Sequence, residues 1–191
     1  MAATWDFHFI CPTPMELEKI LRKQMVHSIA SIDNWEWQNQ HSLSHISEIN
    51  NTLNKGKIVI VDIELNSYKS AGLYIQKEKE NVFIYNFWIN TEGFPELDSD
   101  TINKDNFMQY LHAYQIIGKL LKKHPIDFKA IAIGVESDMQ YSDDIKDMIN
   151  HSKNITVWIL LQNIGTNLTI ENYHKKTIVE LAAFIFEKEM P

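Results

Sequence analysis

The sequence predicts an α+β fold, with a mixed sheet covered by helices in a single domain over residues 1–191. Three observations support this prediction. Residues 57–90 contain three consecutive strand patterns, 57–64, 71–77 and 81–90, which predict a central antiparallel meander. The last of them, VFIYNFWI, is apolar at nearly every position, as is typical of a strand buried on both faces. Segments with helical periodicity precede and follow the meander.

The first thirty residues predict a strand and a long helix. Residues 4–10 alternate, with aromatic side chains on one face and Asp6 and His8 on the other, so we expect a half-buried strand. The sequence TPME at 13–16 is typical of a capped helix start. An apolar stripe follows it, which predicts a helix that ends near residue 30.

The segments on either side of the meander are mostly helical in pattern. Residues 32–41 are ambiguous and favour a strand with one exposed face, and residues 42–53 predict a short helix. After the meander, residues 91–105 are irregular and acidic. The longest helix is expected from about residue 105 to 123.

The C-terminal third predicts two interior strands and two helices. The apolar runs at 129–135 and 155–161 have the composition of buried strands. Ser142 precedes a short helix that carries acidic residues in its first turn. Apolar residues spaced through 169–185 predict a final helix.

Composition and charge limit the classes of partner. The formal net charge of −7 disfavours a nucleic-acid partner, because phosphate binding needs a basic face. The N-terminus has no basic region of a signal peptide, and no apolar run approaches the ~20 residues of a membrane span. Cys11 is the single cysteine and suits a reducing compartment. We therefore expect a cytoplasmic protein without a membrane or nucleic-acid partner.

Catalytic and cofactor motifs are not found in the sequence. There is no G-x-S-x-G elbow, and the six glycines form no phosphate-binding loop. Cys11 precedes a proline and has no histidine beside it that would activate a nucleophilic thiolate. The sequence predicts no cofactor.

One triplet has the spacing of a metal site. His41, His45 and Glu48 lie at i, i+4 and i+7, so on a helix they share a face and could hold a divalent metal. Because this spacing is met often by chance, a solvated helix face is the favoured interpretation.

Two carboxylate pairs are candidates for acid–base chemistry. Asp62 and Glu64 share a strand face with apolar residues, where burial would raise a pKa. Glu136 and Asp138 follow an interior strand, a common position for a site. In both cases the favoured interpretation is a solvent-exposed carboxylate.

Exposed aromatic and acidic residues predict a protein-binding surface. Two tryptophans lie in the polar stretch WEWQNQHS, and exposed aromatics are frequent interface anchors, but packing over one edge of the sheet is the favoured interpretation of these two residues. Carboxylates of the 92–100 segment and of the helix near 145 suit a cationic partner. The candidate partner-binding residues are Trp35, Trp37, Glu92, Asp98, Asp100, Asp143, Asp144 and Asp147.

The element order resembles that of the GNAT acyltransferases: strand, two helices, three-stranded meander, long helix, strand, helix, strand. In that family a Q/R-x-x-G-x-G/A turn before the long helix binds the CoA pyrophosphate. Here the corresponding turn reads NTEGFP at 90–95 and lacks the motif. The resemblance implies an acyltransferase with a degenerate acyl-CoA site.

The chain also resembles the small acidic immunity proteins encoded beside bacterial toxins, and the stretch YNFWINTEGFPELD has the character of such families. This resemblance implies a bacterial α+β protein that binds a basic toxin domain and has no active site. Our leading hypothesis is a non-catalytic protein-binding module, an immunity-type inhibitor of a cationic partner.

Overall fold

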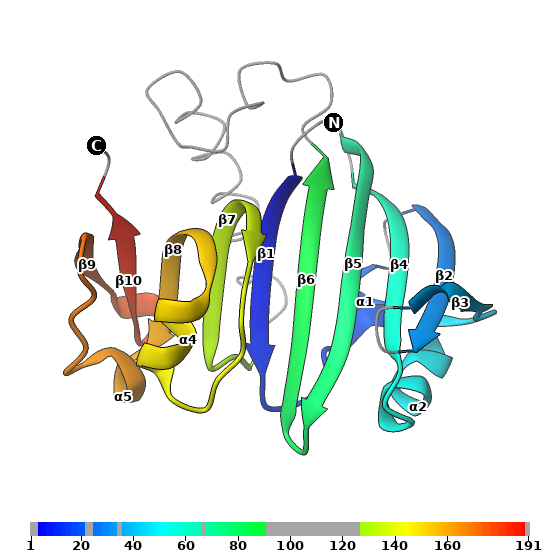
Figure 1. Ribbon diagram of the computed structural model, residues 1–191, viewed down its shortest axis with the longest axis horizontal. Helices are drawn as coiled ribbons and strands as arrows, with labels where there is room; N and C mark the ends of the chain where they lie inside the picture. Colours follow the sequence, from blue (N-terminus) through cyan, green and yellow to red (C-terminus); the bar gives the residue numbers. More distant parts are fainter. Residues whose placement is uncertain (1–3, 22–24, 34–35, 66–67, 91–126, 190–191) are drawn as a thin grey trace.

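A ten-stranded sheet, antiparallel at every pairing, dominates the computed structural model (Figure 1). The structure describes residues 4–21, 25–33, 36–65, 68–90 and 127–189. The strand order is β3-β2-β4-β5-β6-β1-β7-β8-β10-β9. The strands are β1 (Thr4–Cys11), β2 (Met25–Asp33), β3 (Glu36–Ser42), β4 (Ile58–Leu65), β5 (Tyr68–Lys79), β6 (Val82–Asn90), β7 (Ala130–Asp138), β8 (Lys153–Leu161), β9 (Tyr173–Ile178) and β10 (Ala183–Lys188).

The described helices are short. They are α1 (Leu17–Ile20), η1 (Ile46–Glu48), α2 (Ile49–Asn54), α4 (Ile145–His151), α5 (Gln162–Gly165) and η3 (Val179–Leu181). None of them combines the length and the apolar character needed to cross a membrane.

The predicted fold class is therefore wrong. The described chain is nearly all β, whereas the sequence predicted a mixed sheet covered by helices in a GNAT-like order. Two predicted helices are replaced by strands: residues 25–33 form β2, and residues 173–188 form β9 and β10. The predicted acidic loop and long helix, at 91–123, lie outside the described residues.

Pairing across the sheet explains both replacements. Helical periodicity holds only through α1, which begins at Leu17 and has Glu16 as an N-cap without a side-chain hydrogen bond, so the capping box predicted at 13–16 is not formed. β2 then pairs with β4. The segment AFIFEK of β10 is rich in aromatic and β-branched residues, which suit a pleated, half-buried surface.

The predicted meander is confirmed as β4, β5 and β6, and the two predicted C-terminal interior strands are confirmed as β7 and β8. The predicted first strand is also confirmed, but it is not half-buried. β1 lies between β6 and β7 in the middle of the sheet, and the side chains on both of its faces are buried, including Asp6 and His8, which are each only 5% exposed.

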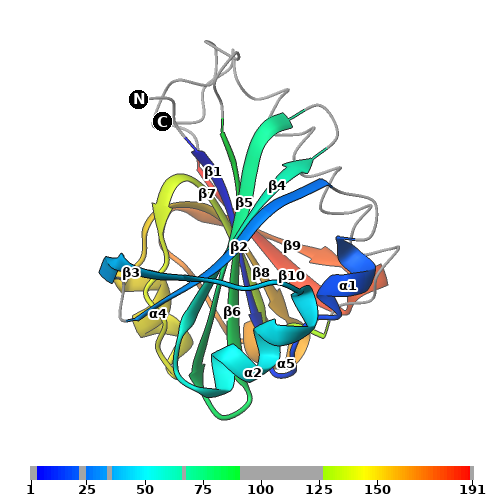
Figure 2. The same ribbon diagram turned by 90° about the vertical axis from the view of Figure 1, so that its right-hand side faces the viewer.

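Two apolar clusters lie on opposite faces of the sheet. One face packs against α1 and α2 and contains Phe7, Phe9 and Tyr85. The other packs against α4 and contains Trp158 and Phe186. Figure 2 shows α1 and α2 on one side of the sheet and α4 on the other. On the α4 side, no described helix passes in front of β1, β6 and β5 (Figure 1).

Candidate functional site

A row of polar side chains crosses the middle of the sheet on the α4 side. The register places His8 opposite Asn86, and Asn86 opposite Tyr74. Asp6 precedes His8 by two residues and therefore shares its face. Directly opposite residues on one face are close neighbours. β1 and the hairpin of β5 and β6 thus bring an acid, an imidazole, an amide and a phenol together.

The end of β7 adds Ser137 to this row. The backbone N–H of Ser137 donates to Asp6 Oδ2 at 2.8 Å. The hydroxyl lies 2.9 Å from His8 Nε2 and donates to Asp6 Oδ2 at 3.3 Å. The preceding residue, Glu136, has a φ of 46°, in the left-handed region that non-glycine residues rarely adopt. Asn154 holds this turn by donating to the Glu136 carbonyl at 3.0 Å.

Burial shifts the pKa values of both titratable groups. It raises the pKa of Asp6 to about 7, although hydrogen bonds from Ser137 and Asn86 oppose the rise. It lowers the pKa of His8 to about 4. Both shifts have the same origin, because a poorly solvated site disfavours the charged form of each group. At neutral pH His8 is uncharged and Asp6 is partly protonated.

The hydrogen bond between Asn86 and Asp6 determines which way the Asn86 amide is oriented. The hydrogen bond from Asn86 favours the ionised form of Asp6, so its donor is the amide nitrogen. The amide oxygen, Oδ1, is left buried and has no hydrogen-bond partner in the described part of the chain. Unsatisfied buried polar atoms are uncommon in folded proteins, so this oxygen marks a place where a donor is needed.

A cavity of about 130 Å³ opens over these side chains. Its floor and rim combine polar and aliphatic groups: His8, Asn86, Tyr74, Ser137, Asp138 and Ile84 are among its lining residues. Burial raises the pKa of Tyr74, and the negative charges of Asp62 and Asp6 raise it further. The electrostatic field at this pocket is therefore negative.

The serine, histidine and aspartate do not have the arrangement of a catalytic triad. In a triad the carboxylate binds the imidazole and stabilises its protonated form. Here Asp6 binds Ser137 instead, and burial disfavours a protonated His8. The three side chains are therefore linked through Ser137, which bonds to Asp6 and lies beside His8.

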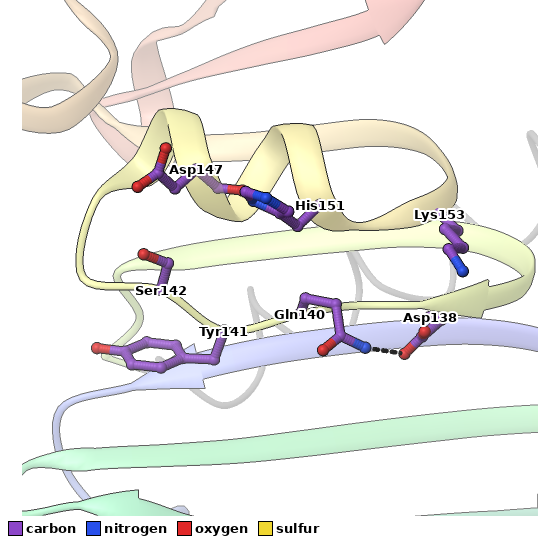
Figure 3. A pocket seen from close by; sticks show the side chains of 7 residues that line it. All are labelled: Asp138, Gln140, Tyr141, Ser142, Asp147, His151 and Lys153. Carbon is purple, nitrogen blue, oxygen red and sulfur yellow. Dashed lines mark hydrogen bonds between the residues drawn. The ribbon is translucent and has the colours of Figure 1, made fainter.

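A second, larger pocket of about 470 Å³ lies beside α4 (Figure 3). Asp147 and His151 reach it from the helix, while Asp138 and Lys153 lie at the neighbouring strand ends. Asp138 accepts a hydrogen bond from Gln140 at 2.7 Å. Because Asp138 lines both pockets, they meet at this carboxylate.

The three predicted partner-binding aspartates near α4 have different surroundings. Asp143 forms an ion pair with Lys79 and accepts a hydrogen bond from Tyr141. Asp144 caps α4 by accepting from the backbone N–H groups of Lys146 and Asp147. Asp147 is exposed, and its carboxylate has no ion pair with any residue the structure describes. Of the three, only Asp143 is neutralised by an ion pair in the described chain.

The other predicted partner-binding residues cannot be placed. Trp35, Glu92, Asp98 and Asp100 lie outside the described residues, as does the side chain of Trp37.

The helix face on which the metal prediction depended is not formed. His41 belongs to β3, His45 is the N-cap of η1, and Glu48 lies in η1. The Glu48 carboxylate accepts from the backbone N–H of His45 at 2.8 Å and so caps this turn. Within the ranges that the structure describes, no cluster of three metal-ligating side chains is found.

The other carboxylates that the sequence suggested for acid–base chemistry lie beside polar groups of neighbouring strands, and the single cysteine is buried. Asp62 accepts a hydrogen bond from Ser28, and Glu64 lies 3.8 Å from His27. Glu136 accepts from the backbone N–H of Thr4 at 2.7 Å. Cys11 is buried, which raises its pKa to about 12 and leaves the thiol unreactive.

The sequence pattern places Asp6 and His8 on the polar face of a half-buried strand, and it does not identify Asn86 and Ser137 as site residues. The available signal was the placement of Asp6 and His8 within a run of aromatic residues.

Scans against protein-family models, curated proteins and solved structures find no match to this chain.

Proposed function

We propose that this protein is a non-catalytic binding module for a cationic protein partner, of the kind found among immunity-type inhibitors. The surface that supports this proposal lies around α4. The stretch 136–147 contains five carboxylates and a single lysine. Charge of one sign favours partners of the opposite sign.

The observation that carries the proposal is the position of Asp138 and Asp147. Both side chains are exposed, and they line the same pocket from different elements. Of the neighbouring acids, Asp143 is paired with Lys79, and Asp144 caps the start of α4. A basic group that enters this pocket would therefore meet two carboxylates that are not neutralised by an ion pair within the described chain.

The mechanism of such a module is occlusion. Opposite charges speed the encounter, and the bound module then covers the partner's working surface. The triad geometry that covalent chemistry would require is not formed by Asp6, His8 and Ser137, which is consistent with a binding role.

The test begins with the product of a neighbouring gene, or a partner identified by cross-linking to the full chain. Affinity is compared for the wild type, the double variant Asp138→Asn/Asp147→Asn, and the control Glu16→Gln/Glu18→Gln. The control removes the same charge from the α1 region, on the opposite face of the sheet. We expect the first variant to weaken binding by about tenfold and the control to leave it unchanged. Equal affinities for both variants would refute the assigned surface.

A further inference from the structure

The pocket over His8 has no positively charged residue in its lining but is surrounded by acidic groups. Its lining includes the carboxylate of Asp138 and contains no lysine or arginine. Asp62 and Asp6 act electrostatically on Tyr74, which lines the pocket. Glu136 in turn acts on Asp6. A ligand that matches this field is a cation.

The pocket also provides hydrogen-bond acceptors in fixed positions. The Asn86 side chain forms a hydrogen bond with Asp6, and its Oδ1 is buried and lacks a partner within the described residues. Asp138 provides a second acceptor at the rim. His8 is uncharged at neutral pH and therefore does not repel a cation. An N–H donor with a positive charge would satisfy the buried oxygen.

The lining and the volume of the pocket favour a flat cation over a compact one. Ile58, Ile84 and the ring of Tyr74 contribute its apolar walls. A guanidinium group is planar, weakly hydrated and stacks on aromatic faces, whereas an ammonium is a strongly hydrated point charge. The cavity volume of about 130 Å³ is close to that of a cavity that holds a benzene-sized molecule, about 150 Å³.

We propose that this pocket receives the guanidinium group of an arginine side chain presented by the protein partner. Asn86 Oδ1 and the Asp138 carboxylate accept hydrogen bonds from it, and Tyr74 lies against its plane. This inference rests on the proposed function for the source of the arginine, but the pocket's chemistry can be tested without a partner.

The experiment titrates the full chain with N-acetyl-arginine methylamide and follows the NMR signals of the Asn86 side-chain amide and the His8 imidazole. N-acetyl-citrulline methylamide is the matched probe, because it has nearly the same shape without the charge. Asp138→Asn removes the rim charge. Asp147→Asn is the matched control, because Asp147 lines only the neighbouring pocket.

We expect saturable shifts of both signals with the arginine probe and none with the citrulline probe. Asp138→Asn should weaken binding about threefold or more, and Asp147→Asn should leave it unchanged. Equal shifts with both probes, shifts confined to other residues, or no saturable shift would overturn the inference.

The outcomes separate this inference from the proposed function. If the arginine probe fails to bind while partner affinity still depends on Asp138 and Asp147, the arginine pocket is wrong and the acidic docking surface stands. If the probe binds as expected while partner affinity is insensitive to both aspartates, the guanidinium site stands and the acidic docking surface is wrong.

Discussion

Asp6 and His8 are two titratable side chains in the middle of a sheet, and burial shifts their pKa values in opposite directions. A raised carboxyl pKa means that the folded chain holds a proton which the unfolded chain has released. The stability that Asp6 contributes is therefore fully present below about pH 4 and is lost as the pH rises through about 7. For His8 the stability is present above about pH 6.5 and is lost as the pH falls toward 4.

The variant Asp6→Asn should become more stable relative to the wild type as the pH rises from 4 to 8. The expected change in the free-energy difference is a few kcal/mol, since each unit of pKa shift corresponds to about 1.4 kcal/mol. His8 is present in both proteins, so its opposing effect cancels in the comparison. Urea denaturation at several pH values measures the difference. A difference that is constant across this range would contradict the buried, proton-retaining Asp6.

Gly134 is a position where any side chain would meet the backbone. A Cβ there would lie 2.1 Å from the carbonyl oxygen of Asn154, so Gly134→Ala should destabilise the protein by about 2–3 kcal/mol. Gly56 is the control: its φ is 76° but nothing lies within 4 Å, so Gly56→Ala should cost about 1 kcal/mol. Thermal or urea unfolding of both variants measures which one loses more stability. A larger loss for Gly56→Ala would contradict the close approach of β7 and β8.

At the scale of single residues, part of the site could be predicted from the sequence. Asp6 and His8 were visible as polar residues within an aromatic strand, but alternation alone cannot distinguish a polar face in water from one inside a sheet. Ser137 joins them only because the left-handed turn at Glu136 closes the end of β7. Asn86 joins them through pairing between β1 and β6. Both contacts depend on residues far apart in the chain.

At the scale of elements, the apolar runs of β6, β7 and β8 were predicted as strands, whereas β2, β9 and β10 lie in segments predicted as helices. The runs that became β6, β7 and β8 are apolar over most of their length, and no helix could satisfy both of their faces. β2 and β9 carry mixed side chains that fit either periodicity. Pairing with β4 and β10 decides their structure, and such long-range pairing is not encoded in a local window.

Phe186 tests the assignment of the last segment as a strand. It is completely buried against Trp158 and the residues around it, so Phe186→Ala should destabilise the protein by about 3–5 kcal/mol. Val179 is 78% exposed, and Val179→Ala should change stability by less than about 0.5 kcal/mol. Chemical denaturation of the two variants gives the comparison. Similar small effects would show that β10 does not pack in the core.

At the scale of the whole molecule, an open sheet leaves two edges, β3 and β9. β9 carries exposed Lys175 and Lys176, and lysines on an edge discourage pairing with another chain. Lys175 also donates to the carbonyls of Gly165 and Thr166, at 2.6 and 2.7 Å, which ties this edge to α5. Lys176 pairs with Glu187 of the neighbouring strand β10, so this edge is held by polar contacts on both of its lysines.

The central claim is the proposed docking of a cationic partner where Asp138 and Asp147 line one pocket. The most direct measurement is the association rate with the purified partner as the ionic strength is raised from about 0.02 to about 0.5 M. Over this range the screening length falls from about 20 Å to about 4 Å. The account predicts a steep fall in rate for the wild type and a shallower fall for Asp138→Asn/Asp147→Asn. The same salt dependence in both proteins, or none in either, would contradict it.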